Sequence, residues 1–249
     1  DDAGLASHRR AAQILAATAR DAFAHLADRL RAGEEVTEAG LRTWVLKELA
    51  RRGAGAGADC IVANGPNAAN PHYEPGERGA VLGEGDVVLL DLWAKETEDS
   101  IYADQTWMAY VGERVPDRVA ELFAIIRDGR DAAVEFLRAA WKEGREVQGW
   151  EVDDVTRRVV TERGYGEHFF HRTGHSIDRA VHGMGPNIDN LETHETRLLL
   201  PGVGFSIEPG IYLPGDIGLR TEIDVYIGED GPEVTTPGAQ SEVFAVLAR

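Results

Sequence analysis

The stretch Val87–Trp93 reads VVLLDLW, an apolar run of strand length that carries one acidic residue inside it. Side chains alternate between the two faces of a strand, so Val87, Leu89 and Asp91 share one face of this predicted strand. An ionised aspartate among apolar neighbours is costly unless a cation stands beside it. We therefore expect either a metal ion or an arginine next to Asp91.

Further acids stand in or beside predicted strands. Asp104 lies in YADQTW, on the face that Tyr102 and Thr106 share, and Glu208 follows an apolar pair in FSIEPGIY. In the predicted strand Leu219–Ile227 one face is largely apolar, and the other carries Arg220, Glu222, Asp224 and Tyr226. We expect this strand to bury its apolar face in a core and to turn its charged face toward another part of the protein.

Histidines supply a second kind of ligand. His175 lies in HRTGHS, and His182 follows seven residues later. Carboxylate and imidazole ligands together suit Mn, Fe, Co or Zn. Four carboxylates and one imidazole are too many for one small cation, and they suit two metal ions about 3.5–4 Å apart. Taken singly, each residue also has an ordinary interpretation, as an aspartate at a bulge, a glutamate in a turn or an exposed histidine.

The pattern along the chain predicts a mixed α+β protein. Stretches rich in good helix formers, with their start and stop residues, predict helices at Leu5–Leu30, from the N-cap Thr37 to Arg52, from Pro116 to Trp141, and at Glu151–Arg163. Apolar runs predict strands at Asp59–Ala63, Val87–Trp93, Ile101–Val111, His168–Arg172, Gly204–Tyr212, Leu219–Ile227 and Ser241–Leu247.

The chain also resembles itself. Gly33-Glu-Glu-Val36 precedes a helix that stops at Gly53, and Gly144-Arg-Glu-Val147 precedes a helix that stops at Gly164. The two glycine pairs have the same separation, and in each case a long helix comes before the unit and strands come after it. This repeat predicts a single domain over residues 1–249, made of two related halves of about 1–115 and 116–249. A site between such halves would draw ligands from both.

Composition limits the classes of partner. The 249 residues carry a formal net charge of −17, which argues against binding nucleic acid or an anionic membrane through bulk charge. Cys60 is the one cysteine, so an internal disulfide and a thiolate metal cluster are excluded, and a reducing compartment fits. No apolar run approaches the ~20 residues of a membrane span, and no secretory signal is present. We expect a cytoplasmic protein, and a homodimer stays open.

The order of these acids and histidines resembles that of the pita-bread metallopeptidases, the family of methionine aminopeptidase, prolidase and Xaa-Pro aminopeptidase. The resemblance spans the whole chain and includes the duplicated halves. It implies a pita-bread fold, in which antiparallel sheet is flanked by helices, and a pair of divalent metal ions, with Mn favoured and Co, Zn or Fe as alternatives. It assigns the metal ligands, in chain order, to Asp91 (LLDLW), Asp104 (ADQT), His175 (RTGHS), Glu208 (SIEPGIY) and Glu222 (GLRTEID).

The resemblance also implies residues that contact the substrate. His72, in GPNAANPHY, resembles a histidine on the substrate side, and His182, in AVHG, resembles one that hydrogen-bonds the substrate carbonyl or the intermediate. Arg220 resembles an arginine found before the last ligand in Xaa-Pro enzymes, and an ion pair to a neighbouring acid explains it equally well. Trp93 replaces a glycine that the family commonly has after the first ligand, and Gly183 replaces a glutamate. These departures fall beside the substrate pocket and leave every ligand intact.

The activity implied by the resemblance is metal-assisted hydrolysis of an N-terminal peptide bond, on a peptide with a free N-terminus. Glu208 is then expected to move a proton from water to the leaving nitrogen. The strings GPN…PHY and EPGIY favour an Xaa-Pro aminopeptidase or dipeptidase, with methionine aminopeptidase as the alternative. A binding protein without peptidase activity, or a hydrolase of a non-peptide amide, stays open on the same fold.

Overall fold

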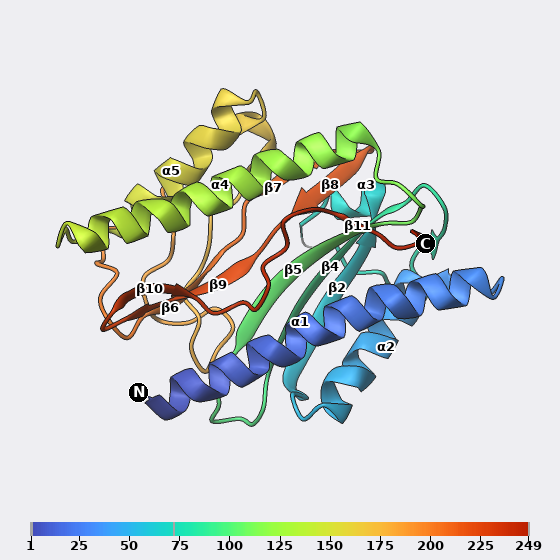
Figure 1. Cartoon of the computed structure of the whole chain (residues 1–249), viewed down its shortest axis with the longest axis horizontal. Coiled ribbons are helices and arrows are strands. Elements are labelled where there is room, and N and C mark those ends of the chain that lie inside the picture. The colour runs from blue at the N-terminus through green and yellow to red at the C-terminus, as the bar shows by residue number, and fades with distance from the viewer. Residues whose placement is uncertain (1, 72, 249) are drawn as a thin grey trace.

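The computed structural model describes residues 2–71 and 73–248, which form an α+β fold (Figure 1). The first part of the chain contains α1 (Asp2–Arg31), β1 (Val36–Thr37), α2 (Glu38–Arg51), β2 (Ala56–Asn64), α3 (Gly65–Ala68), β3 (Val81–Leu82), β4 (Val87–Lys95) and β5 (Ala103–Tyr110). The second part contains α4 (Asp117–Lys142), α5 (Gly149–Glu162), the 3-10 turn η1 (Gly166–His168), β6 (Gly204–Ile207), β7 (Gly210–Leu213), β8 (Ile217–Arg220), β9 (Ile223–Gly228), β10 (Gly231–Val234) and β11 (Phe244–Ala245).

The strand predicted at VVLLDLW is β4, an inner strand of a four-stranded sheet with the order β11-β5-β4-β2. β4 and β5 are antiparallel, with Asp91 opposite Thr106 and Trp93 opposite Asp104. Directly opposed residues of an antiparallel pair share a face of the sheet. The register therefore turns both aspartates toward the same side.

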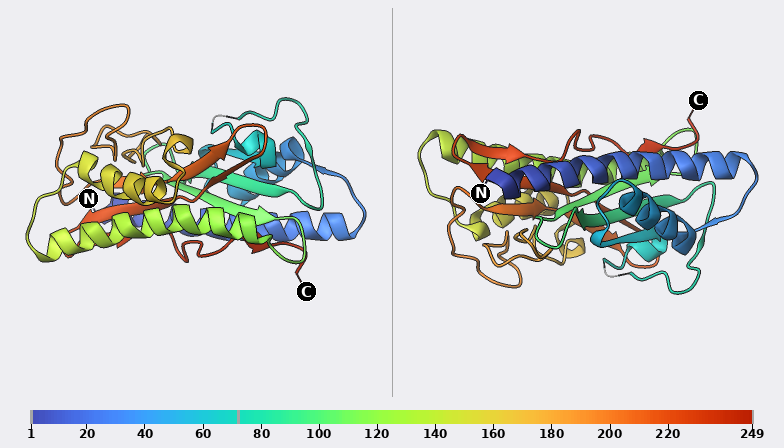
Figure 2. Two further views of the ribbon diagram at one scale, coloured as in Figure 1. Left: turned by 90° about the horizontal axis from the view of Figure 1, so that it is seen from above. Right: turned by 90° about the horizontal axis from the view of Figure 1, so that it is seen from below.

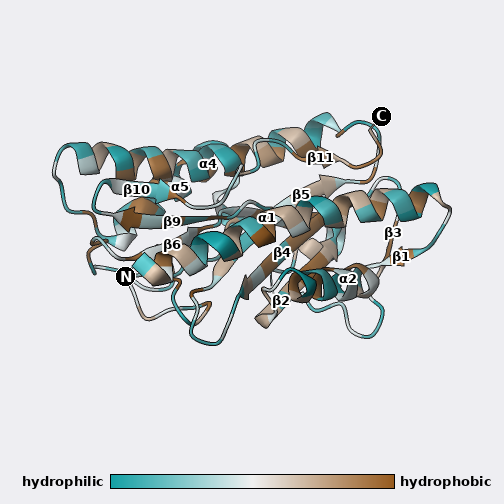
Figure 3. Cartoon of the chain, turned by 60° about the horizontal axis from the view of Figure 1, so that its bottom comes forward, coloured by the Kyte–Doolittle hydropathy of each residue, from teal (hydrophilic) through white to brown (hydrophobic). Residues whose placement is uncertain are grey.

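Helix α1 covers the other side of this sheet. Leu15 and Leu26 on α1 are fully buried at 0% exposure and belong to one core with Leu90 and Trp107 of the sheet. Figure 3 shows hydrophobic and hydrophilic residues alternating along α1, as expected of a helix with one buried face. Each buried leucine contributes about 1.5–3 kcal/mol, so this packing fixes the strands that carry the two aspartates.

The second part of the chain builds a three-stranded sheet, β10-β9-β6, and the hairpin β7–β8. Leu137 of α4, Val152 of α5, Phe205 of β6 and Val225 of β9 belong to its core. In Figure 2, α1 and α4 lie along one side of the molecule, whereas the long segment between α5 and β6 lies on the other. Within residues 2–71 and 73–248, no helix is long and apolar enough to cross a membrane.

The helix predictions are confirmed to within a few residues. The Thr37 side chain accepts a hydrogen bond from the Gly40 N–H at 3.1 Å, as an N-cap should. Pro116 stands one position earlier than predicted, as the residue before α4 rather than in its first turn. After the four main helices, Gly33, Gly53, Gly144 and Gly164 adopt positive φ values of 73°, 86°, 64° and 86°. Only glycine takes this conformation without strain, which explains why each helix ends there.

Three strand predictions in the second part are wrong in their extent. The predicted strand Gly204–Tyr212 is divided into β6 and β7 at Glu208-Pro209, where proline offers no N–H to continue a ladder. The predicted strand Leu219–Ile227 is divided into β8 and β9 at Thr221-Glu222. Of the predicted strand Ser241–Leu247, only β11 pairs with a neighbour, at β5.

The predicted strand His168–Arg172 is not formed. Its backbone groups bond to side chains of α5 in place of a neighbouring strand. Arg157 donates to the carbonyl oxygens of Phe169 and His171, both at 2.9 Å, and Asp153 accepts from the N–H of Thr173 at 2.9 Å. These side chains hold the segment that leads directly into His175.

Candidate metal and peptide site

The five predicted metal ligands come from separate elements and meet at one cavity of about 270 Å³. Asp91 lies on β4 and Asp104 on β5, and His175 lies in the segment between η1 and β6. Glu208 follows β6 directly, and Glu222 stands between β8 and β9. The two interruptions that divide the predicted strands therefore each carry a glutamate into the cavity.

His175 is at the centre of this group. Its Nε2 lies 3.5 Å from Asp104 Oδ2 and 3.3 Å from Glu208 Oε1. One ligand atom each from Asp104, His175 and Glu222 lies within 4.8 Å of the others. The Nδ1 of His175 faces the Ser176 carbonyl at 3.2 Å, and a carbonyl only accepts, so Nδ1 carries the proton. Nε2 is then unprotonated and faces the carboxylates, which is the tautomer that binds a metal.

Hydrogen bonds hold two of the carboxylates in place. The Thr106 hydroxyl donates to Glu222 Oε2 at 2.7 Å. The Ser206 hydroxyl donates to Glu208 Oε1 at 3.0 Å and also accepts the N–H of His175 at 3.0 Å. Ser206 thereby couples the position of Glu208 to that of His175.

Burial and mutual repulsion make this group of acids unfavourable when all are ionised. Burial, followed by the charges of Asp91 and Glu208, raises the pKa of Asp104 well above its usual value. Burial and the neighbouring Asp104 raise the pKa of Glu222 in the same way. For Glu208 burial acts in the same direction, but the nearby His175, His171 and Arg220 outweigh it, and its pKa is lowered. The group as a whole therefore favours bound cations or protons.

The donor set fits divalent metal ions. Oδ1 of Asp91 and Oδ1 of Asp104 are buried and lack a hydrogen-bond partner among the described residues. Buried polar atoms nearly always have a partner, so two such oxygens in one cavity indicate that something else binds there. Carboxylate oxygens with an imidazole nitrogen match the preferences of Mn, Fe, Co and Zn.

Arg220 lies at the cavity and forms an ion pair with Asp91. Its Nε also donates to the Thr106 hydroxyl at 3.0 Å, and its Nη1 donates to the Tyr212 hydroxyl at 3.2 Å. Burial raises the pKa of Asp91, and Arg220 opposes that shift. Arg220 bonds Oδ2 of Asp91, and Oδ1 stays available to a metal ion. Asp91 can therefore have both of its predicted partners, an arginine and a metal.

The predicted substrate residues surround the same cavity where the structure describes them. The ring centroids of His182 and His175 lie 4.4 Å apart at an interplanar angle of 82°, an edge-to-face contact. Trp93 lines the cavity, opposite Asp104 in the strand register. His72 lies outside the described residues, although its neighbour Pro71 is at the cavity.

Two residues of the site were missed by sequence reasoning. His171 lines the cavity, and its Nε2 lies 2.8 Å from the hydroxyl of Tyr212. Burial lowers the pKa of His171 to about 4, so the ring is neutral at pH 7. Its Nδ1 donates to the Arg172 carbonyl at 2.7 Å, which leaves Nε2 to accept from Tyr212. Both residues stand inside the strings HRTGHS and EPGIY, in which only His175 and Glu208 are predicted as site residues.

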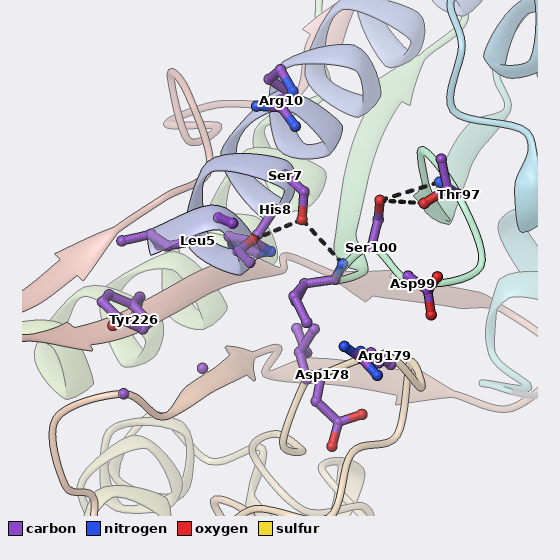
Figure 4. Close-up of a pocket in the computed structure, with 16 residues that line it drawn as sticks. Leu5, Ser7, His8, Arg10, Thr97, Asp99, Ser100, Asp178, Arg179 and Tyr226 are labelled. Carbon is purple, nitrogen blue, oxygen red and sulfur yellow. Dashed lines mark hydrogen bonds between the residues drawn. The ribbon is translucent and has the colours of Figure 1, made fainter. Parts of the chain in front are cut away.

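A second cavity of about 460 Å³ lies between the start of α1, residues 97–101 and residues 177–179 (Figure 4). Of the predicted site residues that the structure describes, none lines it. The converging acids therefore distinguish the smaller cavity as the candidate active site.

Known proteins place this arrangement in a family. The family model described as Metallopeptidase family M24 matches residues 6–229. A probable dipeptidase PepE of Mycobacterium tuberculosis is 34% identical over 195 residues, which cover 78% of this chain and 48% of that protein. The Xaa-Pro dipeptidase of Lactobacillus delbrueckii is 36% identical over 173 residues, covering 70% of this chain and 43% of the relative. The chain thus spans about half the length of the curated relatives it matches.

Solved structures of dipeptidases and aminopeptidases support the same family. The dipeptidase PepE from Mycobacterium ulcerans matches with a TM-score of 0.84 and 29% identity, over 99% of this chain and 61% of that one. The X-Pro aminopeptidase from Thermotoga maritima matches with a TM-score of 0.83 and 31% identity, over 98% and 64%. These matches confirm the predicted pita-bread fold and the family resemblance drawn from the sequence. The chain belongs to metallopeptidase family M24.

Proposed function

We propose that this chain is the catalytic unit of a metal-dependent exopeptidase that cleaves the bond between an N-terminal residue and a following proline. The observation that carries the proposal is the convergence of four carboxylates and His175 on one cavity of about 270 Å³. This volume lies just below the usual 300–1,000 Å³ range of ligand pockets, which fits a short peptide. The relatives named Xaa-Pro dipeptidase and X-Pro aminopeptidase support the choice of substrate.

Two divalent ions, with Mn favoured and Co, Zn or Fe as alternatives, would be held by Asp91, Asp104, His175, Glu208 and Glu222. A metal pair at such a site lowers the pKa of water and polarises a carbonyl group. The Oδ1 atoms of Asp91 and Asp104, which lack a partner among the described residues, support this assignment.

Glu208 moves the proton in this proposal. Its lowered pKa leaves the carboxylate ionised at neutral pH, and Ser206 orients it through Oε1. An ionised, oriented carboxylate accepts a proton from the attacking water and returns it to the leaving nitrogen.

Substrate contacts fall to residues around the cavity. His182 donates a hydrogen bond to the substrate carbonyl, a role supported by its edge-to-face contact with His175. His72 assists from the substrate side. Trp93, Ile61 and Val181 form apolar walls for the N-terminal side chain. Arg220 fixes the positions of the Asp91 carboxylate and the Tyr212 hydroxyl by bonding to both.

Metal content and substrate profile together test the proposal. Purified protein should contain about two Mn, Fe, Co or Zn ions per chain by elemental analysis. It should hydrolyse Xaa-Pro dipeptides or longer Xaa-Pro peptides faster than Met-Ala peptides. Preference for Met-Ala would assign a methionine aminopeptidase. Absence of turnover on every peptide with added Mn²⁺ or Co²⁺ would refute the peptidase and favour a binding protein or a hydrolase of another amide.

We further propose that residues 1–115 and 116–249 are two related halves of a single catalytic domain. In each half a long helix ends at a glycine of positive φ, and a helix of 14 residues then ends at another. Strands that lead into the site follow in both. This proposal accounts for a ligand set drawn from both parts, since Asp91 and Asp104 come from the first and the other ligands from the second.

A further inference from the structure

β11 pairs with only the last residues of β5, Ala109 and Tyr110, and side chains bond the rest of this edge, from Asp104 to Met108. β5 belongs to the four-stranded sheet and β9 to the three-stranded one, and no ladder joins them. The Asp104 N–H is instead accepted by the two carboxylate oxygens of Asp224, at 3.3 and 3.2 Å. Further along the edge, the Gln240 side chain accepts the Met108 N–H at 2.8 Å and donates to the Met108 carbonyl at 2.6 Å. Gln240 lies in the segment between β10 and β11, and we call the edge of β5 that Asp224 and Gln240 contact the seam.

The seam brings together two of the ligands from opposite sheets. Asp104 lies on β5, and Glu222 directly precedes β9. We call the Asp224 and Gln240 side-chain contacts to β5 the two clamps. Between them, the Glu222 N–H donates to the Thr106 carbonyl at 3.4 Å, a long and weak hydrogen bond. The Thr106 hydroxyl donates to Glu222 Oε2 at 2.7 Å across the same contact, so the spacing of the Asp104 and Glu222 carboxylates depends on this bond and on the bond from Asp104 to Asp224.

Asp224 is itself firmly held. It is 1% exposed, and its own N–H donates to the Thr236 hydroxyl at 2.8 Å. Its carbonyl accepts the Thr235 N–H at 2.9 Å. Asp224 is not among the described residues that line the cavity, and its carboxylate contacts the backbone of Asp104.

His8 of α1, labelled in Figure 4, also bonds to this region. Its Nδ1 lies 2.6 Å from the Tyr102 carbonyl and its Nε2 lies 2.7 Å from the Thr235 hydroxyl. Burial lowers the pKa of His8, so the ring is neutral, donates through Nδ1 and accepts through Nε2. Through His8, helix α1 links Tyr102, which directly precedes β5, to Thr235, whose N–H donates to the Asp224 carbonyl.

We infer that Asp224 is a positioning residue of the metal site, which sets Asp104 of one sheet against Glu222 of the other. The inference rests on the metal site of the proposed function but assigns a residue that binds no metal itself. Groups that orient metal ligands typically change metal affinity by 10–100-fold when they are removed. Without Asp224, the buried Asp104 N–H also loses its acceptor, and β5 can shift relative to β9.

The test compares the two clamps of the seam. Asp224→Ala and Gln240→Ala each remove one side-chain clamp from β5, but only Asp224 stands behind a ligand. Mn²⁺ would be titrated calorimetrically into the metal-free proteins, and thermal unfolding would be followed in EDTA. We expect Asp224→Ala to lose about 10–100-fold in Mn²⁺ affinity. Gln240→Ala should unfold at a lower temperature in EDTA and keep the wild-type affinity. Asp224→Asn, which keeps one acceptor oxygen, should fall between wild type and Asp224→Ala, and it carries the test if the alanine variant does not fold.

The outcomes separate this inference from the proposed function. Wild-type affinity in Asp224→Ala, or an equal loss of affinity in Gln240→Ala, would overturn the positioning role, because either result reduces Asp224 to a structural contact. A wild-type protein that binds Mn²⁺ but cleaves no peptide, together with a selective loss in Asp224→Ala, supports the inference while the proposed activity fails. A wild-type protein that takes up no Mn²⁺ refutes both.

Discussion

Replacing Asp104 with asparagine should stabilise the metal-free protein and abolish its stabilisation by metal. A ligand oxygen of Asp104 and one of Glu222 lie no more than 4.8 Å apart in a buried site. At an effective dielectric constant of about 20, two like charges at that distance repel by roughly 3–4 kcal/mol. Proton uptake relieves part of this repulsion, so we expect Asp104→Asn to gain about 1–3 kcal/mol in the free energy of unfolding at pH 8 without metal.

The gain should depend on pH in a defined direction. The folded protein holds Asp104 and Glu222 with raised pKa values, so it binds more protons than the unfolded chain above about pH 4. The stability contributed by these groups is therefore complete below about pH 4 and is lost as the pH rises through the folded-state pKa values. Wild-type protein in EDTA should lose stability between pH 5 and pH 8, and Asp104→Asn should lose less of it.

Thermal unfolding at pH 5 and pH 8, in EDTA and with Mn²⁺, measures both effects. For a chain of this size, the expected gain corresponds to a rise in Tm of about 3–10 °C at pH 8. Asp153→Asn is the matched control, because Asp153 is equally buried but has a cation partner, Arg157, at 2.9 Å. That variant should lose roughly 2 kcal/mol with or without metal. If Asp104→Asn is less stable than wild type in EDTA at pH 8, or is stabilised equally by Mn²⁺, the repulsive cluster described here is wrong.

Three other substitutions probe the remaining parts of the site. Arg220→Met removes the cation beside Asp91 and leaves a buried charge unpaired, so it should cost about 3–5 kcal/mol of unfolding free energy in EDTA and less with Mn²⁺, as urea unfolding would show. An effect of the same size in both conditions would contradict the shared neutralisation of Asp91 by Arg220 and metal. His182→Ala should lower kcat by about 10²–10³-fold on an Xaa-Pro dipeptide with metal content unchanged in elemental analysis, and loss of metal would show that His182 is a ligand. Trp93→Gly should widen the cavity wall and raise the ratio of kcat/KM for Phe-Pro over Ala-Pro by about 10-fold or more, whereas an unchanged ratio would remove Trp93 from the substrate pocket.

Local sequence patterns predicted those parts of the fold that local physics determines. The long helices and β4 follow from periodicity, caps and terminal glycines, and their positions are confirmed. The segment before His175 was mistaken for a strand, because its backbone is bonded by Arg157 and Asp153 of a distant helix, and no local pattern encodes such bonds. The charged face of Leu219–Ile227 was predicted to turn toward another part of the protein, and Arg220, Glu222 and Asp224 all bond to β5 or β4.

The convergence of the acids could not be derived from spacing alone. Asp91 and Asp104 face the same side because of the β4–β5 register, which the intervening turn sets. Glu208 and Glu222 enter the cavity because their strands break beside them, although the sequence pattern favoured continuous strands. In the sequence, only the order of ligands shared with a family links Asp91 and Asp104 to Glu208 and Glu222.

The position of the site at the seam links the proposed metal binding to the fold. Four carboxylates carried by the two sheets or by residues next to their strands repel one another, and Arg220 is the one arginine among the described residues paired with any of them. The Asp224 side chain of β9 bonds the Asp104 N–H of β5 across the two sheets, in place of a continuous backbone ladder, and the Gln240 side chain bonds Met108 of β5 from the segment between β10 and β11. Cations bound between the sheets would convert the repulsion into attraction for both sides at once. Under the proposed metal binding, the free energy of binding would also join the two sheets, and the inferred positioning of Asp104 by Asp224 would then affect metal affinity as well as the fold.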